Sequence, residues 1–193
     1  CVFRNCVFEN NAGHGMFVRA HDTVTADSPP ISIRFENCIS RMSVRGEGGD
    51  GGMVVRVPGD NGPRGLIEFI NCTSENMGQV GANVYGHSTG KLKVRYVNCN
   101  WKGTTGPAVR LNLEQPSMAE NPGNVEFVNC TIYDDTAGPA VQILSIRGGG
   151  GDYRRDFTGT ITVHNQHGAR MEIDPASVQV DLRTVGTGDS AGQ

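Results

Sequence analysis

The stretch FENC, residues 35–38, recurs along this chain with small changes. It returns as FRNC at residues 3–6, FINC at 69–72, YVNC at 96–99 and FVNC at 127–130. The Asn residues of these copies are separated by 32, 34, 27 and 31 residues. A nearly fixed spacing of this kind predicts a repeat architecture, in which each copy is one structural unit stacked on the last.

A second phrase follows each Asn-Cys pair and begins with glycine. Its copies are GMFVRAH from Gly15, GMVVRVP from Gly52, GANVYGH from Gly81, GPAVRLN from Gly106 and GPAVQIL from Gly138. Both phrases alternate apolar with other residues and are rich in β-branched and aromatic types, so each repeat holds two extended segments. No stretch shows helical periodicity. We therefore expect an all-β solenoid whose parallel strands rest on those of the preceding coil.

The two phrases resemble those of the right-handed parallel β-helix, or pectin-lyase-like, superfamily, and the resemblance covers about residues 1–175. It implies a single-stranded right-handed parallel β-helix of about five to six coils. We expect this domain to occupy residues 1–183, as part of a longer β-helix, and residues 184–193 to form a flexible tail. Lyases, hydrolases, epimerases, phage tailspikes and adhesins share this architecture, so the resemblance does not select one function.

Charge and hydropathy disfavour two classes of partner. The chain has 17 Lys and Arg against 20 Asp and Glu, without a basic run, so we do not expect nucleic acid binding. No apolar stretch approaches the roughly 18 residues of a membrane span.

Glu47, Asp50 and Asp60 lie in glycine-rich segments and could offer oxygen ligands to calcium, but no calcium-binding motif accompanies them. We therefore expect no cofactor.

The Asn-Cys pairs are expected to be structural. Each Asn lies where the chain must turn, and stacked amides can hydrogen bond along the rod and to turn backbone. Each Cys should be a small buried hydrophobe in a column of reduced thiols, because parallel side chains in single file cannot surround a zinc ion. The predicted ladder consists of Asn5, Asn37, Asn71, Asn98 and Asn129 with Cys6, Cys38, Cys72, Cys99 and Cys130.

The glycine phrase defines a candidate functional face. Aligned on its glycine, it gives an inward column of Val18, Val55, Val84, Val109 and Val141, and an outward column of Arg19, Arg56, Tyr85, Arg110 and Gln142. Arginine offers planar donors to carboxylates or sulfates, and tyrosine offers a ring to a sugar. We therefore predict binding of an acidic polysaccharide by Arg19, His21, Arg56, Tyr85, His87, Arg110 and Asn112. Ordinary solvated arginines paired with nearby acids are the alternative.

Two other functions remain open at this stage. A lyase that cleaves uronate-containing glycans by β-elimination needs a cation for the carboxylate and groups that move protons; the candidate catalytic residues are His87, Tyr85 and Arg110. A glycoside hydrolase is less favoured, because Asp134 and Asp135 are adjacent and far along the chain from the GHG tripeptide at residues 13–15. The third reading is a structural segment of a tailspike or adhesin-like protein, extracellular or at the cell surface, for which the resemblance implies a homotrimer.

Overall fold

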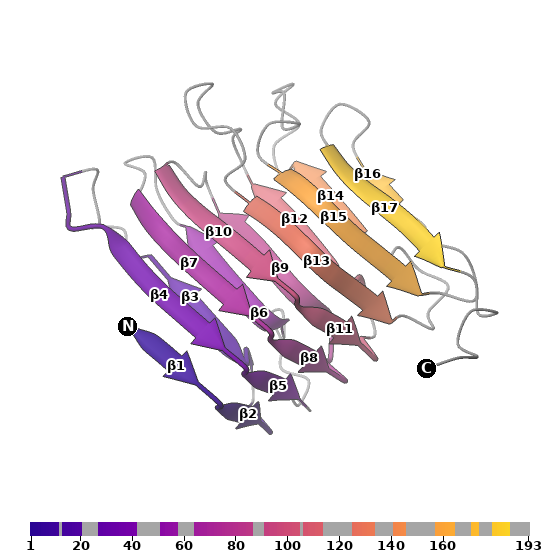
Figure 1. Cartoon of the computed structure of the whole chain (residues 1–193), viewed down its shortest axis with the longest axis horizontal. Coiled ribbons are helices and arrows are strands. Elements are labelled where there is room, and N and C mark those ends of the chain that lie inside the picture. The colour runs from indigo at the N-terminus through magenta and orange to yellow at the C-terminus, as the bar shows by residue number, and fades with distance from the viewer. Residues whose placement is uncertain are drawn as a thin grey trace.

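The computed structural model of the chain describes residues 1–11, 13–20, 27–41, 51–57, 64–86, 91–104, 106–113, 125–133, 141–145, 157–164, 171–173 and 179–185. All regular elements among these residues are β-strands. The strands stack along one axis in chain order, from indigo to yellow in Figure 1. Every strand pair is parallel and joins equivalent segments of successive repeats. The prediction of an all-β parallel β-helix is confirmed.

The strands form three faces of the solenoid. Face 1 holds β1 (Val2–Arg4), β4 (Ile31–Glu36), β7 (Arg64–Ile70), β10 (Lys91–Val97), β13 (Val125–Tyr133), β15 (Phe157–His164) and β17 (Gln179–Val185). Face 2 holds β2 (Val7–Glu9), β5 (Ile39–Arg41), β8 (Thr73–Glu75) and β11 (Asn100–Lys102), and continues in the ends of β13 and β15. Face 3 holds β3 (Met16–Arg19), β6 (Gly51–Val57), β9 (Val80–Gly86), β12 (Val109–Leu113), β14 (Val141–Ser145) and β16 (Met171–Ile173).

The number of coils differs somewhat from the five to six expected. Seven strands stack on face 1 in the described part of the chain, because β17 pairs with β15 beyond the last clear sequence repeat. β17 ends at Val185, and residues 186–193, which include most of the expected tail, lie outside the described residues. The described residues contain no helix that is long and apolar enough to cross a membrane.

A stack of aromatic rings fills the interior behind face 1. Successive rings, from one Asn-Cys phrase to the next, lie with centroids 4.8, 5.1, 5.0 and 5.3 Å apart and planes within 11° of parallel. The stack consists of Phe3, Phe35, Phe69, Tyr96 and Phe127. Trp101 of β11 packs edge-on against Tyr96. The spacing follows the roughly 4.8 Å between strands, so the repeated aromatic position becomes a continuous core.

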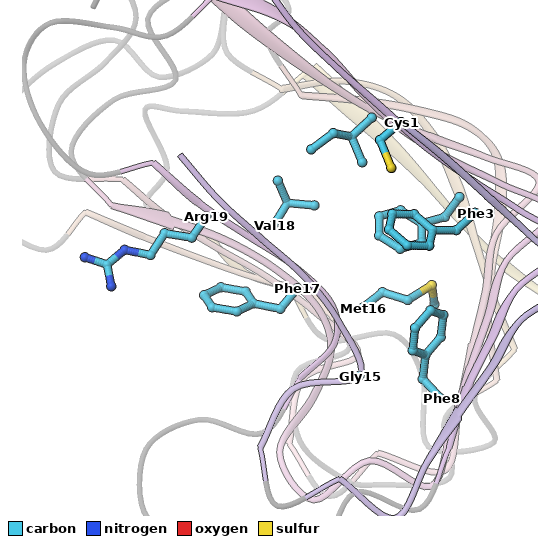
Figure 2. A pocket seen from close by; sticks show the side chains of 10 residues that line it. Cys1, Phe3, Phe8, Gly15, Met16, Phe17, Val18 and Arg19 are labelled. Carbon is cyan, nitrogen blue, oxygen red and sulfur yellow. The ribbon is translucent and has the colours of Figure 1, made fainter. Parts of the chain in front are cut away.

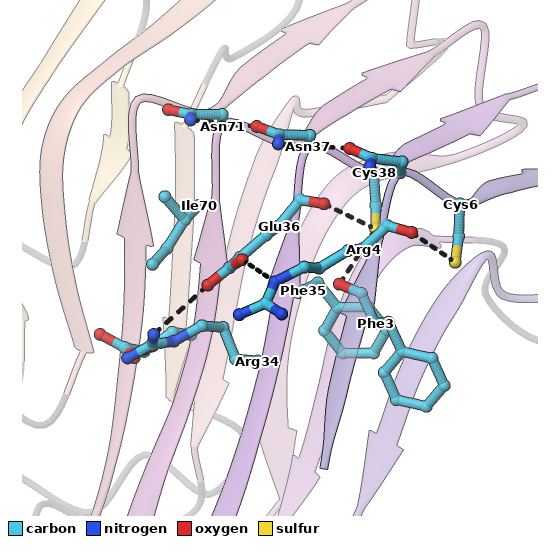
Figure 3. Close-up of polar contacts among 12 residues, drawn as sticks. Phe3, Arg4, Cys6, Arg34, Phe35, Glu36, Asn37, Cys38, Ile70 and Asn71 are labelled. Carbon is cyan, nitrogen blue, oxygen red and sulfur yellow. Dashed lines mark hydrogen bonds and ion pairs between the residues drawn. The ribbon is translucent and has the colours of Figure 1, made fainter.

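Side-chain hydrogen bonds join four of the five predicted ladder residues, Asn5, Asn37, Asn71 and Asn98, at the corner between faces 1 and 2. All five Asn residues have φ between 50° and 54°, the left-handed conformation that Asn adopts more readily than most residues. The side-chain amide of Asn37 donates to Oδ1 of Asn5 at 3.3 Å, Asn71 donates to Asn37 at 3.1 Å, and Asn98 donates to Asn71 at 3.1 Å. Figure 3 shows Asn37 and Asn71 following one another along this corner. The ladder is exposed, so it fixes the corner from the solvent side.

The cysteine column lies inside the same corner, as predicted. Four of its thiols are free and buried, and the first, Cys6, is partly buried. Cys72 donates to the carbonyl oxygen of Phe35 at 3.5 Å, and Cys99 donates to that of Phe69 at 3.2 Å, so each thiol reaches back to the preceding coil. Burial raises the pKa of Cys99 well above its ordinary value. No metal-binding group of side chains is present among the described residues.

The leading glycines of the second phrase let faces 2 and 3 approach each other closely. A Cβ on Gly52 would lie 1.9 Å from Oγ of Ser74, and one on Gly81 would lie 2.4 Å from the Trp101 ring. A side chain at either position would overlap its neighbour. Gly52 and Gly81 are therefore required by packing at the start of β6 and β9.

Candidate functional site

The outward side of face 3 brings together part of the predicted site. Arg19 pairs in register with Arg56, and Arg56 pairs with Tyr85. Figure 2 shows Arg19 and Phe17 on the side of β3 that points away from the interior, where Met16 points. We call the set Arg19, Arg56 and Tyr85 the Arg/Tyr column.

The position predicted for Arg110 in this column is wrong by two residues. Tyr85 pairs with Asn112, whereas Arg110 pairs with Asn83 in the neighbouring outward column. Because of the same shift, the inward-pointing Val84 pairs in register with Leu111 and not with Val109. A shift of two residues keeps each side chain on its own side of the strand, so Arg110 still lies on the outward side.

The error came from aligning glycines. The backbone N–H of Gly106 donates to the carbonyl of Gln79 at 2.9 Å, so Gly106 lies two positions before the equivalent of Gly81. In these two coils the count from the corner Asn gives the observed pairing, since Tyr85 and Asn112 each follow their corner Asn by 14 residues, whereas Arg56 follows Asn37 by 19.

Arg56 and Tyr85 form the best-defined contact of this face. The guanidinium carbon of Arg56 lies 5.7 Å from the centroid of the Tyr85 ring, which is a cation–π distance. Both side chains are partly buried, and no carboxylate contacts Arg56 among the described residues. Arg110 is also partly buried, and its desolvation lowers the pKa of its guanidinium. Beside it, Oδ1 of Asn83 is buried without a hydrogen-bond partner in the described part of the chain.

Face 1 carries a ladder of alternating charge that the sequence analysis missed. Glu68, only 5% exposed, accepts from Arg34 Nη2 at 2.6 Å and from Arg95 Nη1 at 3.2 Å. Arg95 Nε in turn donates to Glu126 at 2.7 Å. A signal for the ladder exists, because Arg34, Glu68, Arg95 and Glu126 each stand three residues before a corner Asn.

The start of this ladder is drawn in Figure 3, where Arg4 and Arg34 both contact Glu36. The hydrogen bond from Arg4 is the main cause that lowers the pKa of Glu36. Because positive and negative charges neutralise each other along face 1, this face does not present a basic surface to an anionic ligand.

Face 2 holds a shallow hollow of about 470 Å³ lined by Thr73, Asn100, Lys102 and Tyr133. Tyr133 is 47% exposed, and its ring stacks on His164 with centroids 4.8 Å apart. Sequence reasoning missed this hollow too. A signal for it exists in the sequence. Thr73 and Asn100 each stand two positions after a corner Asn, and Lys102 and Tyr133 each stand four positions after one.

A second hollow, of about 420 Å³, lies at the end of the solenoid formed by the first strands. Figure 2 shows Phe3, Phe8 and Met16 pointing into it. Val18 and Phe35 also line it, so this hollow is the apolar end of the core. It offers few polar groups to orient a ligand.

Several predicted site residues lie outside the described residues. These are His21 and His87 of the binding face, and Glu47, Asp50 and Asp60, the calcium candidates. Of the proposed catalytic set, Tyr85 and Arg110 lie on adjacent strands two residues apart in register, which makes them diagonal neighbours.

Comparison of the chain with family models, with curated proteins and with solved structures found no match in any of the three.

Proposed function

We propose that this β-helix domain binds an acidic polysaccharide along the Arg/Tyr column, with Arg110 beside it. The observation that carries the proposal is the pairing of Arg56 with Tyr85. In the described part of the chain this guanidinium rests on a ring and contacts no carboxylate, whereas Arg34, Arg41 and Arg95 each contact a glutamate. Arg56 is thus a cation that an external carboxylate or sulfate can pair with.

The geometry of face 3 suits a linear ligand. The column runs along the solenoid axis with one residue per coil, so its members are about 4.8 Å apart. A chain of acidic sugars laid along the axis would meet a cation at each of two coils and then a ring at the third.

Local charge supports selectivity for face 3. The chain as a whole has a net charge of −3, which disfavours general attraction of polyanions. Binding would depend on Arg56, which contacts no carboxylate in the described part of the chain. A domain that binds acidic glycans in this way would act outside the cell or at its surface.

The test compares polyanion binding by the wild-type chain, Arg56→Gln and the matched control Arg64→Gln. Arg64 is an exposed arginine of face 1 and also carries one positive charge. Alginate, pectate and a sulfated glycan are titrated by calorimetry at low and moderate salt. We expect Arg56→Gln to weaken binding about 10-fold, the effect of losing one charge-assisted hydrogen bond of about 1.4 kcal/mol, and Arg64→Gln to have little effect.

Equal losses in the two variants would refute a specific site. No binding of any polyanion would favour the structural-segment reading. The same mixtures, followed by absorbance for an unsaturated sugar product, test the lyase reading. If product forms, Tyr85→Phe should abolish it without abolishing binding.

A further inference from the structure

The hollow of face 2 differs in chemistry from the Arg/Tyr column and is built from other strands. Thr73 of β8 and Asn100 of β11 pair in register and form one wall. Lys102 of β11 and Tyr133 at the end of β13 pair in register and form the other. We call this set the Tyr133 groove. Its volume of about 470 Å³ falls within the range of roughly 300–1,000 Å³ typical of small-ligand sites.

The first wall offers polar groups that the protein does not use. In the described part of the chain, no protein group hydrogen bonds to the side-chain amide of Asn100 or to the hydroxyl of Thr73. Thr131 and Thr162 continue the same row on the next two strands. These amide and hydroxyl groups can both donate and accept, which matches the hydroxyls of a sugar.

The second wall is an aromatic ring held in place. One side of Tyr133 stacks on His164 with the two planes 11° apart. Lys102 reaches away from Tyr133 to Glu75, with Nζ 2.8 Å from Oε1. Tyr133 lines the groove together with Lys102. A half-exposed tyrosine at a strand position offers an apolar surface for the C–H groups of a sugar ring and a hydroxyl for its rim.

The charges around the groove cancel in pairs. Glu75 neutralises Lys102, and in the same outward column Arg41 pairs with Glu9 at 2.8 Å. A polyanion entering the groove would approach Glu75 and would have to break its ion pair. A peptide added as a further strand is also excluded, because β11 already pairs with a strand on each side.

From these contacts we infer that the Tyr133 groove binds a neutral, hydroxyl-rich sugar chain. One sugar ring stacks on Tyr133, and its hydroxyls hydrogen bond to Asn100 and Thr73. This site is separate from the proposed polyanion site on face 3, and neither depends on the other.

The experiment uses four neutral oligosaccharides, cellohexaose, xylohexaose, mannohexaose and maltohexaose, titrated into the whole chain and followed by calorimetry and by ligand-observed NMR. We expect at least one to bind. Tyr133→Ala should weaken that binding about 10-fold, as for loss of one stacked ring, whereas Tyr133→Phe should retain most of it. Asn100→Ala should weaken it about 5-fold, the effect of one lost hydrogen bond.

The control is Arg56→Gln, which should leave neutral-sugar binding unchanged while it weakens polyanion binding. Thermal melting of each variant verifies folding, and Asn100→Ala provides a second test if Tyr133→Ala unfolds. The inference is overturned if none of the four sugars binds, or if Tyr133→Ala and Asn100→Ala bind as tightly as the wild type. Equal weakening by Arg56→Gln would also overturn it, since it would place the neutral sugar on face 3.

Discussion

Replacing Asn71 by alanine should destabilise the solenoid by removing two features of the corner at once. The first is the left-handed backbone, since Asn71 has φ of 52°. The second is a pair of ladder hydrogen bonds, because its amide donates to Asn37 and its oxygen accepts from Asn98, both at 3.1 Å. Glycine at the same position removes only the second feature, so the two variants separate the two contributions.

The magnitudes follow from these contacts. A left-handed conformation costs an alanine roughly 1–2 kcal/mol. Two exposed amide hydrogen bonds contribute about 0.5–1 kcal/mol each, at the low end of the usual range because solvent competes for them. Asn71→Ala should therefore lower the free energy of unfolding by about 2–4 kcal/mol. Asn71→Gly avoids the steric cost but loses chain entropy of about 0.5–1 kcal/mol, so it should be more stable than the alanine variant by about 1 kcal/mol.

Urea denaturation followed by the fluorescence of Trp101 measures both variants. Trp101 is fully buried and is the only tryptophan, so its emission reports on the core near the Asn98 corner. The comparison uses the midpoint shift at constant slope. An alanine variant as stable as the wild type, or more stable than the glycine variant, would refute the role assigned to the ladder and its backbone.

Three further predictions concern charge and thiols. Glu68→Gln should lower the free energy of unfolding by about 1–3 kcal/mol. The loss is smaller than for a fully buried ion pair, because both partner arginines are at least one-third exposed. An unchanged denaturation midpoint would contradict this. The pKa of the Glu36 carboxyl is lowered from 4.5, so its carboxylate stabilises the fold above about pH 4.5 and loses that effect as the pH falls through the lowered value. Glu36→Gln lacks this titrating group. Its melting temperature should therefore fall less steeply than that of the wild type between about pH 6 and pH 3. A thiol reagent should label exposed Cys1 in the native protein but label buried Cys99 only after unfolding, and rapid native labelling of Cys99 by mass spectrometry would show that the column is open.

The repeat predicted the fold because each of its residue types has a backbone or packing reason to be there. The aromatic residue supplies a ring to the interior stack, the Cys fills the space inside the corner, and the Asn takes the left-handed turn. When all three recur together, successive coils can superimpose in only one register. The ladder and the reduced thiols could be predicted for the same reason.

The candidate site was predicted less well, because the glycine alignment holds for Arg19, Arg56 and Tyr85 but fails at Arg110. Gly81 is required by the approach of Trp101, but the next coil has Ala108 at the equivalent position, as the hydrogen bond from Ala82 N to the Ala108 carbonyl shows. Gly106 is a nearby glycine that does not occupy that position. Counting from the corner Asn does not replace the glycine alignment, because Arg56 follows Asn37 by 19 residues whereas its partner Tyr85 follows Asn71 by 14.

The sequence by itself determined the class of fold, the corner ladder and the side of each strand that faces the core. Each depends on residue type and on a local period, which are visible without coordinates. The tertiary structure decided which outward residues become neighbours. It paired Arg56 with Tyr85, neutralised face 1 through Glu68, and left Tyr133 bordering a hollow. Those neighbours come from different coils some 30 residues apart, so their contacts depend on the register of stacking and on the direction in which each long side chain leans.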